Sequence, residues 1–209
     1  MKRIALIALA LVLPLCMNAQ LFGRKTTVKQ VDNSAYMQGT LPVADGKVVF
    51  SKTIAAPGKS KADLFKALAS WASLRYMANS EHGVWNDADY YKNLEYAAVK
   101  TADPNAGLLS CFADEELVFS NRLLEKDFTR AHYTLDIKVG EGNVEVKMYN
   151  IYYIYNLSDE PEQLTAEDWI TDKEAFTKKG KPIKMNFKFR VKTMDLNDEL
   201  CAEIANAIK

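Results

Sequence analysis

The sequence predicts an α+β fold in which a single curved antiparallel sheet carries helices packed on one face. Apolar and polar residues alternate through 133–139 and again through 144–148, as in two half-buried strands joined by a turn at 140–143. Apolar residues at helical spacing predict helices at 60–76 and 195–208. Each helix has an apolar stripe to cover, and one face of one sheet covers both, so we expect two layers around one core.

The first element is a strand that leads directly into a capped helix. After Asp45-Gly46, the residues Val48, Phe50 and Ile54 fall on one face of an extended chain. Pro57-Gly58 then ends the strand. Ser60 stands three residues before Asp63, a capping-box spacing that satisfies free amide donors at a helix start.

The middle of the chain is predicted to be mostly strand. Short strands are expected at 94–99, 108–112 and 117–119, with a turn at 103–107 between the first two. From Tyr149 to Tyr155 the alternation fails, because aromatic residues fall on both faces. Either this segment is covered on both sides, or a bulge changes its register.

The C-terminal third is predicted to hold a short helix, a strand and a last helix. Thr165 and Asp168 form a capping pair before the short helix. Apolar residues alternate through 183–191 and predict an extended strand whose other face carries a basic stripe, Lys184, Lys188, Arg190 and Lys192. Asp195 is expected to cap the last helix, whose apolar stripe is Leu196, Leu200, Ile204 and Ile208.

The segments 41–76, 133–155 and 189–195 together resemble an exported bacterial family known only as a domain of unknown function with a TBP-like fold. The similarity rests on turns and strand patterns and covers most of the chain after the first residues. It implies a TBP-like fold and an exported protein. It implies no activity, and it carries over no catalytic residue.

The charge balance argues against a polyanionic partner. The chain has 27 basic and 27 acidic residues, and loss of Lys2 and Arg3 with the first 19 residues leaves 25 against 27, a net charge of −2. A nucleic-acid-binding domain needs a basic excess on one face. We therefore expect no nucleic acid partner and no attraction to an anionic membrane.

The first residues are typical of a signal peptide at 1–19. Lys2-Arg3 precedes an apolar run at 4–12 that is too short to span a bilayer, and Ala19 stands at a cleavage site before Gln20. Leu15 is bulky for a lipoprotein signal, so we expect cleavage rather than anchoring through Cys16. Residues 20–38 are then a flexible leader, residues 39–209 one domain, and the mature protein periplasmic or secreted with no stable membrane span.

No catalytic or metal-binding motif is present in the sequence. The two histidines, His82 and His132, belong to no zinc or nucleophile motif, and the polar loop around His82 lacks the spacing of a calcium loop. We expect no cofactor and no metal site, and we lean away from an enzyme. Cys111 and Cys201 remain after export; both a disulfide and two buried thiols are compatible with their apolar surroundings.

Two candidate binding surfaces remain: the basic stripe, which also fits a solvated strand face, and a set of aromatic residues, which we favour. The aromatic residues are Tyr149, Tyr152, Tyr153, Tyr155 and Trp169. Such rings stack on sugars or anchor a partner protein, although they also pack in cores. The leading hypothesis is a non-catalytic envelope domain that binds a protein or small ligand. The alternatives are an envelope hydrolase or lipid- and small-molecule-handling protein with a cleft between helix and sheet, and a structural envelope component.

Overall fold

The structure is a computed structural model that describes residues 32–76, 97–123, 125–155 and 161–209. The predicted signal peptide with Cys16, and the loop that contains His82, lie outside these residues. Residues Asn33–Lys209 form one compact unit, so the folded part begins before Gly39, inside the segment predicted as a leader.

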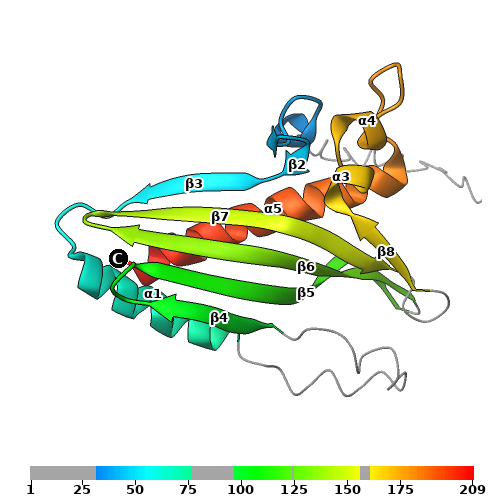
Figure 1. Ribbon diagram of the computed structural model, residues 1–209. Helices are drawn as coiled ribbons and strands as arrows, with labels where there is room; N and C mark the ends of the chain where they lie inside the picture. Colours follow the sequence, from blue (N-terminus) through cyan, green and yellow to red (C-terminus); the bar gives the residue numbers. More distant parts are fainter. Residues whose placement is uncertain (1–31, 77–96, 124, 156–160) are drawn as a thin grey trace, which may run out of the picture. The chain divides into compact units, whose positions relative to one another are not determined.

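One antiparallel sheet forms the centre of this unit (Figure 1). Within the described residues its strands follow the order β3-β7-β6-β5-β4, and the short β8 pairs with β7 beyond the end of β3. The strands are β3 (Phe50–Ala55), β4 (Ala98–Asp103), β5 (Leu108–Arg122), β6 (Glu125–Gly140), β7 (Asn143–Tyr155) and β8 (Glu162–Thr165). The predicted hairpin at 140–143 is confirmed as the β6–β7 turn.

A small separate hairpin precedes β3. It consists of β1 (Val43–Ala44) and β2 (Lys47–Val48), joined by Asp45 and Gly46 at φ values of 50° and 74°. Two consecutive positive φ angles give the turn that matches the twist of two-residue hairpins. The run predicted after Asp45-Gly46 is therefore divided, with Val48 paired to β1 and Phe50 paired to β7.

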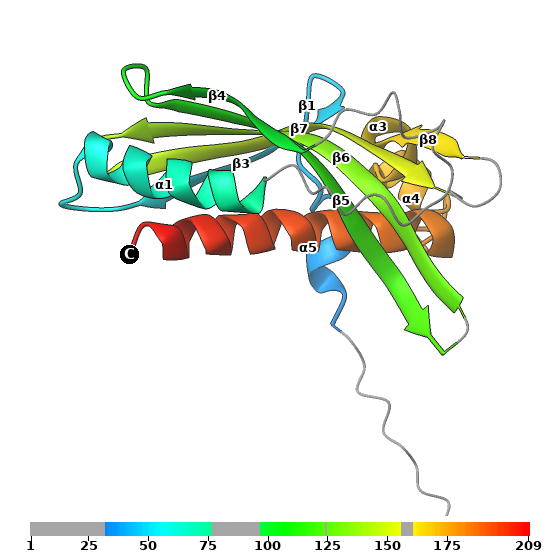
Figure 2. The ribbon, with the colours of Figure 1, turned by 90° about the horizontal axis from the view of Figure 1, so that it is seen from below.

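The two long helices pack on the same face of the sheet, as predicted (Figure 2). We call this face the helix side and the opposite face the outer face. The amide of Asp63 donates to Ser60 Oγ at 3.1 Å, which confirms the capping pair of α1 (Lys61–Arg75). Within the described residues, no helix combines the length and hydrophobicity that a membrane crossing requires. The core residues of α1 and α5 (Lys184–Ala207) are Leu64, Leu68, Ala72, Phe189, Leu196, Leu200 and Ile204.

The strand predicted over 183–191 is wrong, because α5 already begins at Lys184. Buried residues follow one another at intervals of three or four from Phe189 to Ile204, which is a helical period rather than an alternation. Met185, which the strand pattern would bury, is 42% exposed. Asp195 consequently lies inside the helix and caps nothing. Of the predicted basic stripe, Lys184, Lys188 and Lys192 share one side of the helix at intervals of four residues, whereas Arg190 is buried.

Two smaller differences concern the middle strands. The segments predicted as two strands at 108–112 and 117–119 form the single strand β5, paired along its length with β6. Of the strand expected at 94–99, residues 94–96 lie outside the described residues, and β4 runs from Ala98 to Asp103. The turn at 103–107 is confirmed, and Asp103 Oδ1 accepts the amides of Asn105 and Ala106, both at 2.9 Å. The short helix α3 (Ala166–Trp169) begins at the Thr165 cap as predicted, and α4 (Asp172–Ala175) follows it.

A bulge in β7 explains why the alternation fails after Tyr149. Thr134 pairs with Tyr149 and His132 pairs with Tyr152, so Asn150 and Ile151 together lie opposite the one residue between them on β6. Asn150 has a φ of 52°, in the left-handed region that Asn tolerates better than most residues. As a result Ile151 faces the helix side, while Tyr149 and Tyr152 both face outwards.

Arg190 connects α5 to the N-terminal end of the unit. Its guanidinium is fully buried and donates to the carbonyls of Tyr36 and Met37, each at 2.7 Å, and of Ile170 at 3.0 Å. Asp172 supplies the opposite charge at 2.8 Å. Burial lowers the pKa of Arg190, and Asp172 opposes that shift. These bonds hold the 3-10 turn at Ser34–Tyr36 against the domain.

Replacing Asn150 tests the bulge. Asn150→Val is expected to lower the free energy of unfolding by about 1–2 kcal/mol, because a β-branched residue fits the left-handed region poorly. Asn150→Gly, which adopts that conformation freely, is the matched control and should change stability less. Urea unfolding followed by circular dichroism measures both. Equal losses for the two variants would contradict a backbone requirement at this exposed position.

Replacing Arg190 tests the anchor. Arg190→Met is expected to lower the free energy of unfolding by about 3 kcal/mol, because it removes the buried guanidinium that donates to the carbonyls of Tyr36, Met37 and Ile170 and pairs with Asp172. Lys192→Met, two residues along α5, is the control and should cost less than about 1 kcal/mol. The same urea titration compares them. A loss for Arg190→Met no larger than the control would show that the anchor does not stabilise the fold.

Candidate functional site

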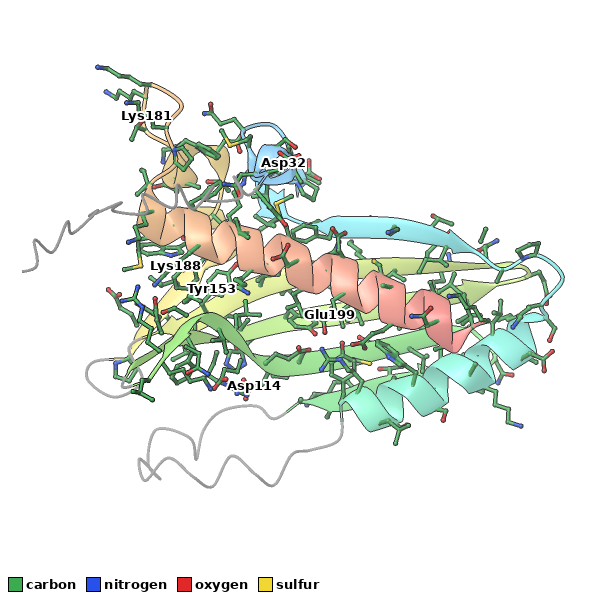
Figure 3. All side chains as sticks on the ribbon, turned by 180° about the vertical axis from the view of Figure 1, so that it is seen from behind. Asp32, Asp114, Tyr153, Lys181, Lys188 and Glu199 are labelled. Atoms are coloured by element: carbon green, nitrogen blue, oxygen red, sulfur yellow. The ribbon has the colours of Figure 1, made fainter. Side chains whose placement is uncertain are left out.

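The five predicted aromatic residues do not form one patch, because the sheet separates them. Tyr153 is fully buried on the helix side, where its hydroxyl lies 2.6 Å from Thr193 Oγ1. The rings of Tyr153, Tyr155 and Trp169 all pack around Phe189 of α5, with centroids 5.1, 5.3 and 6.0 Å from it. Figure 3 shows Tyr153 beside α5. These three residues are therefore part of the helix–sheet interface.

The ammonium group of Lys188 lies against the aromatic rings of this cluster. Its ammonium lies 4.4 Å from the ring centre of Phe119 and 4.9 Å from that of Tyr155, and it donates to Asp127 at 2.7 Å. A cation over aromatic faces beside a carboxylate is a stabilising arrangement. It ties the first turns of α5 to the far end of the β5–β6 hairpin. The cluster thus already holds a cation supplied by the chain itself.

Tyr149 and Tyr152 lie on the outer face, which is turned toward the viewer in Figure 1. The Tyr152 ring stacks on His132 with centroids 4.6 Å apart and an angle of 4° between the planes. Phe112 approaches His132 from β5 at 5.8 Å. Phe112, Tyr149 and Tyr152 are each only partly buried, so part of each ring remains accessible. We call these three rings, with the polar groups beneath them, the outer-face patch.

A charged group lies beneath these rings. Asp114 Oδ1 is 2.8 Å from Arg130 Nε and 2.7 Å from its Nη2, and it is 3.7 Å from His132 Nε2. The side chains of His132 and Asp114 are 0% and 5% exposed. Charges removed from water require partners, and here the partners come from neighbouring strands. The group is therefore held in place by β5 and β6 together.

A second polar group extends the patch along the strands. Asp136 accepts hydrogen bonds from Ser110 at 2.5 Å and from Tyr149 at 3.0 Å. The Lys147 ammonium lies 5.0 Å from the ring centre of Tyr149. Partial burial, together with the bond to Asp136, raises the pKa of Tyr149, so its hydroxyl stays protonated near neutral pH.

The helix side has a polar network of its own at the end of α1. Glu115 accepts hydrogen bonds from Arg75, at 2.7 Å, and from Tyr133, whose hydroxyl is 3.2 Å from that of Tyr76. Arg75 also reaches Glu203 of α5 at 3.2 Å. Burial strongly raises the pKa of Tyr133. This network joins α1, α5 and the sheet through groups that bond to one another.

Sequence reasoning missed most of these residues for an identifiable reason. The run Asp114-Glu115-Glu116 reads as a solvated charged face, whereas in an extended strand its neighbours point to opposite sides. Asp114 enters the outer-face group and Glu115 the helix-side network. The partner Arg130 lies on the next strand, and only the β5–β6 register brings it close. The pair could have been identified from the sequence only if the β5–β6 register had been known.

The cysteines are both buried free thiols, and no disulfide joins them. Burial raises the pKa of Cys111 to about 12 and also raises the pKa of Cys201. A thiol in that state is a poor nucleophile. Among the residues that the structure describes, no group of three or more His, Cys, Asp and Glu side chains is placed to hold a metal ion.

Comparisons with known proteins agree with this fold. Residues 50–154 match a family described as a domain of unknown function (DUF4468) with TBP-like fold. The chain is similar to a DUF4468 family protein from Bacteroides ovatus, with 31% identity, a TM-score of 0.70, and coverage of 85% of this chain and 95% of the other. It is also similar in fold to a TBP-like protein from Parabacteroides distasonis, with 21% identity, a TM-score of 0.62, and coverage of 80% and 96%. No curated protein matches the sequence.

Thiol labelling tests the state of the cysteines. With DTNB at pH 8, Cys111 is expected to react roughly a thousandfold more slowly than an ordinary thiol, because its raised pKa removes the thiolate. In guanidinium chloride without reductant, Cys111 and Cys201 should both react fully. Peptide mass spectrometry identifies the labelled positions. Protection that persists in the unfolded chain would reveal a disulfide and contradict the structure.

Proposed function

Because the chain belongs to the DUF4468 family, whose description specifies a TBP-like fold and no activity, we propose its function from the geometry: it is an exported, non-catalytic binding domain of the cell envelope. The binding surface in this proposal is the outer-face patch. The helix-side tyrosines are excluded from it, because they pack against α5.

The observation that carries the proposal is the Asp114–Arg130–His132 group on the outer face, in which His132 is buried and the Asp114 and Arg130 side chains are largely so. Neither long helix packs on this face, so the helix layer does not account for the burial of the Asp114 and His132 side chains. Placing charged groups out of water is costly, and groups so placed concentrate at functional sites. Their effect here is to fix the orientation of Tyr152, whose ring lies flat against His132.

Export is supported by the N-terminal sequence. A basic pair, an apolar run of signal-peptide length and Ala19 before Gln20 form the pattern of a cleaved signal. We propose that the mature protein acts in the periplasm or outside the cell. In this proposal the outer-face patch, with its paired Asp114 and Arg130, binds its ligand without a cofactor.

The second candidate is an envelope hydrolase or lipid- and small-molecule-handling protein that works between helix and sheet. The Glu115–Tyr133–Arg75 network favours it, because it places a carboxylate and a phenol side by side in that layer. Every group in this network already bonds to another, however. Cys111, the nearby thiol, is held protonated by burial. We therefore rank this function below binding.

Crosslinking in the envelope tests the binding function. The full chain would be expressed in a bacterium that processes its signal, crosslinked in intact cells, and recovered together with the components bound to it. The variant Tyr149→Ser/Tyr152→Ser is expected to lower recovery of the major crosslinked component by about tenfold, because it removes two of the three accessible rings of the patch. The recovered material is quantified by mass spectrometry.

The matched control is Lys138→Ser, on the outer face but outside the patch, which should leave crosslinking unchanged. Equal thermal midpoints for the three proteins would establish that folding is intact. Crosslinking that is identical in wild type and in the double variant would overturn the outer-face assignment.

A further inference from the structure

We propose that the outer-face patch binds a neutral saccharide chain. This inference rests on the proposed function and adds the chemical class of the ligand. It follows from three properties of the patch: its internal charge balance, the placement of its aromatic rings, and the hydrogen-bonding groups between them.

The charges of the patch are matched to one another. Arg130 pairs with Asp114 at 2.7 Å, and Lys147 lies opposite Asp136 in the β6–β7 register. These two pairs carry no net charge, and Lys100, whose ammonium lies 5.7 Å from the ring centre of Phe112, adds one cation beside them. A polyanion or a cationic peptide would have to break these pairs, and that would leave a partly buried charge without its partner. A neutral ligand leaves both pairs intact, and a single cation at Phe112 offers little charge to a polyanion.

The aromatic rings stand in rows across the strands. Phe112 and Tyr149 flank Thr134 on the two neighbours of β6, so they belong to one row of the sheet. Adjacent strands lie about 4.8 Å apart, which places the two Cα positions roughly 10 Å from each other. Tyr152 occupies the next row of β7, beyond the bulge. Rings at these positions form a platform for more than one sugar ring, and aromatic faces stack on the apolar C–H faces of sugars.

The groups between the rings suit hydroxyl ligands. Asp136 accepts from Ser110 and Tyr149 and has carboxylate lone pairs in addition to those two bonds. The Tyr149 hydroxyl, kept protonated, has acceptor capacity of its own. The side-chain hydroxyl of Thr134 lies in the same row and is partly exposed. Sugar hydroxyls both donate and accept, so they match this mixture of groups better than an apolar ligand does.

A peptide strand is a poorer match for this surface. Peptides commonly bind sheets by adding a strand at an edge, where main-chain groups are unpaired. The patch lies on the inner strands β5, β6 and β7. Within the described residues β6 is paired with both neighbours here, β5 is paired with β4 as far as Phe112, and β7 lacks a partner opposite β6 only at 149–151. A ligand on this face meets side chains only. Ring stacking and side-chain hydrogen bonds are the interactions that remain.

Isothermal titration of the purified protein with two neutral probes tests the proposal. The probes are a β-1,4-linked tetramer of N-acetylglucosamine and maltohexaose. At least one is expected to bind with a Kd below about 1 mM. Tyr149→Ser and Tyr152→Ser, made separately, should each weaken that binding about tenfold. Tyr149→Phe keeps the ring and should weaken it less, and Lys138→Ser should leave it unchanged.

The outcomes separate this inference from the proposed function. If neither saccharide binds at millimolar concentration, the ligand class is wrong, although crosslinking in the envelope can still depend on the patch. If a saccharide binds equally well to the serine variants, the placement is wrong. If dextran sulfate binds and the neutral probes do not, the charge argument is overturned. Circular dichroism of each variant excludes unfolding, and Tyr149→Phe preserves the test should a serine variant not fold.

Discussion

The bulge at Asn150 and Ile151 determines the face of every residue that follows it on β7. Without the extra residue, Tyr152 would point to the helices and Tyr153 to the outer face. Tyr153 would then leave the position where it packs on Phe189 and bonds to Thr193. The core at α5 and the outer-face patch therefore depend on the same backbone feature, so a change to either is expected to affect both.

The two faces of the sheet use aromatic residues for opposite purposes. On the helix side the rings are saturated, because Lys188 and Phe189 of α5 occupy the positions that an external ligand would need. On the outer face the rings rest on charged groups and keep part of their surface accessible. One strand supplies both sets. A tyrosine-rich sequence predicts that aromatic side chains are present but not which face they occupy. The register of β7 against β6 decides whether each ring packs in the core or lies on the outer face.

The sheet, α1 and the family were predictable from the sequence because local patterns encode them. The alternation on either side of the 140–143 turn and the Ser60 cap are short-range signals that tertiary contacts merely reinforce. The start of α5 was not predictable in the same way, since alternation over 183–191 imitates a strand and only burial along the longer helix resolves it. The Asp114–Arg130 pair was out of reach for another reason: its residues meet across strands. The failed alternation after Tyr149 predicted either a covered segment or a bulge, and the structure selects the bulge.

The Arg190 anchor has a mechanical consequence. Tension applied to the chain ahead of Asn33 would first reach the 3-10 turn, which Arg190 and Asp195 hold against the middle of α5. The load would then pass into the longest helix of the domain before it reached a strand of the main sheet. The three hydrogen bonds from this segment to α5 would bear that load together. When a strand is pulled from the edge of a sheet, by contrast, its hydrogen bonds break one after another. Tension at this end would therefore reach α5 before the strands that carry the outer-face patch.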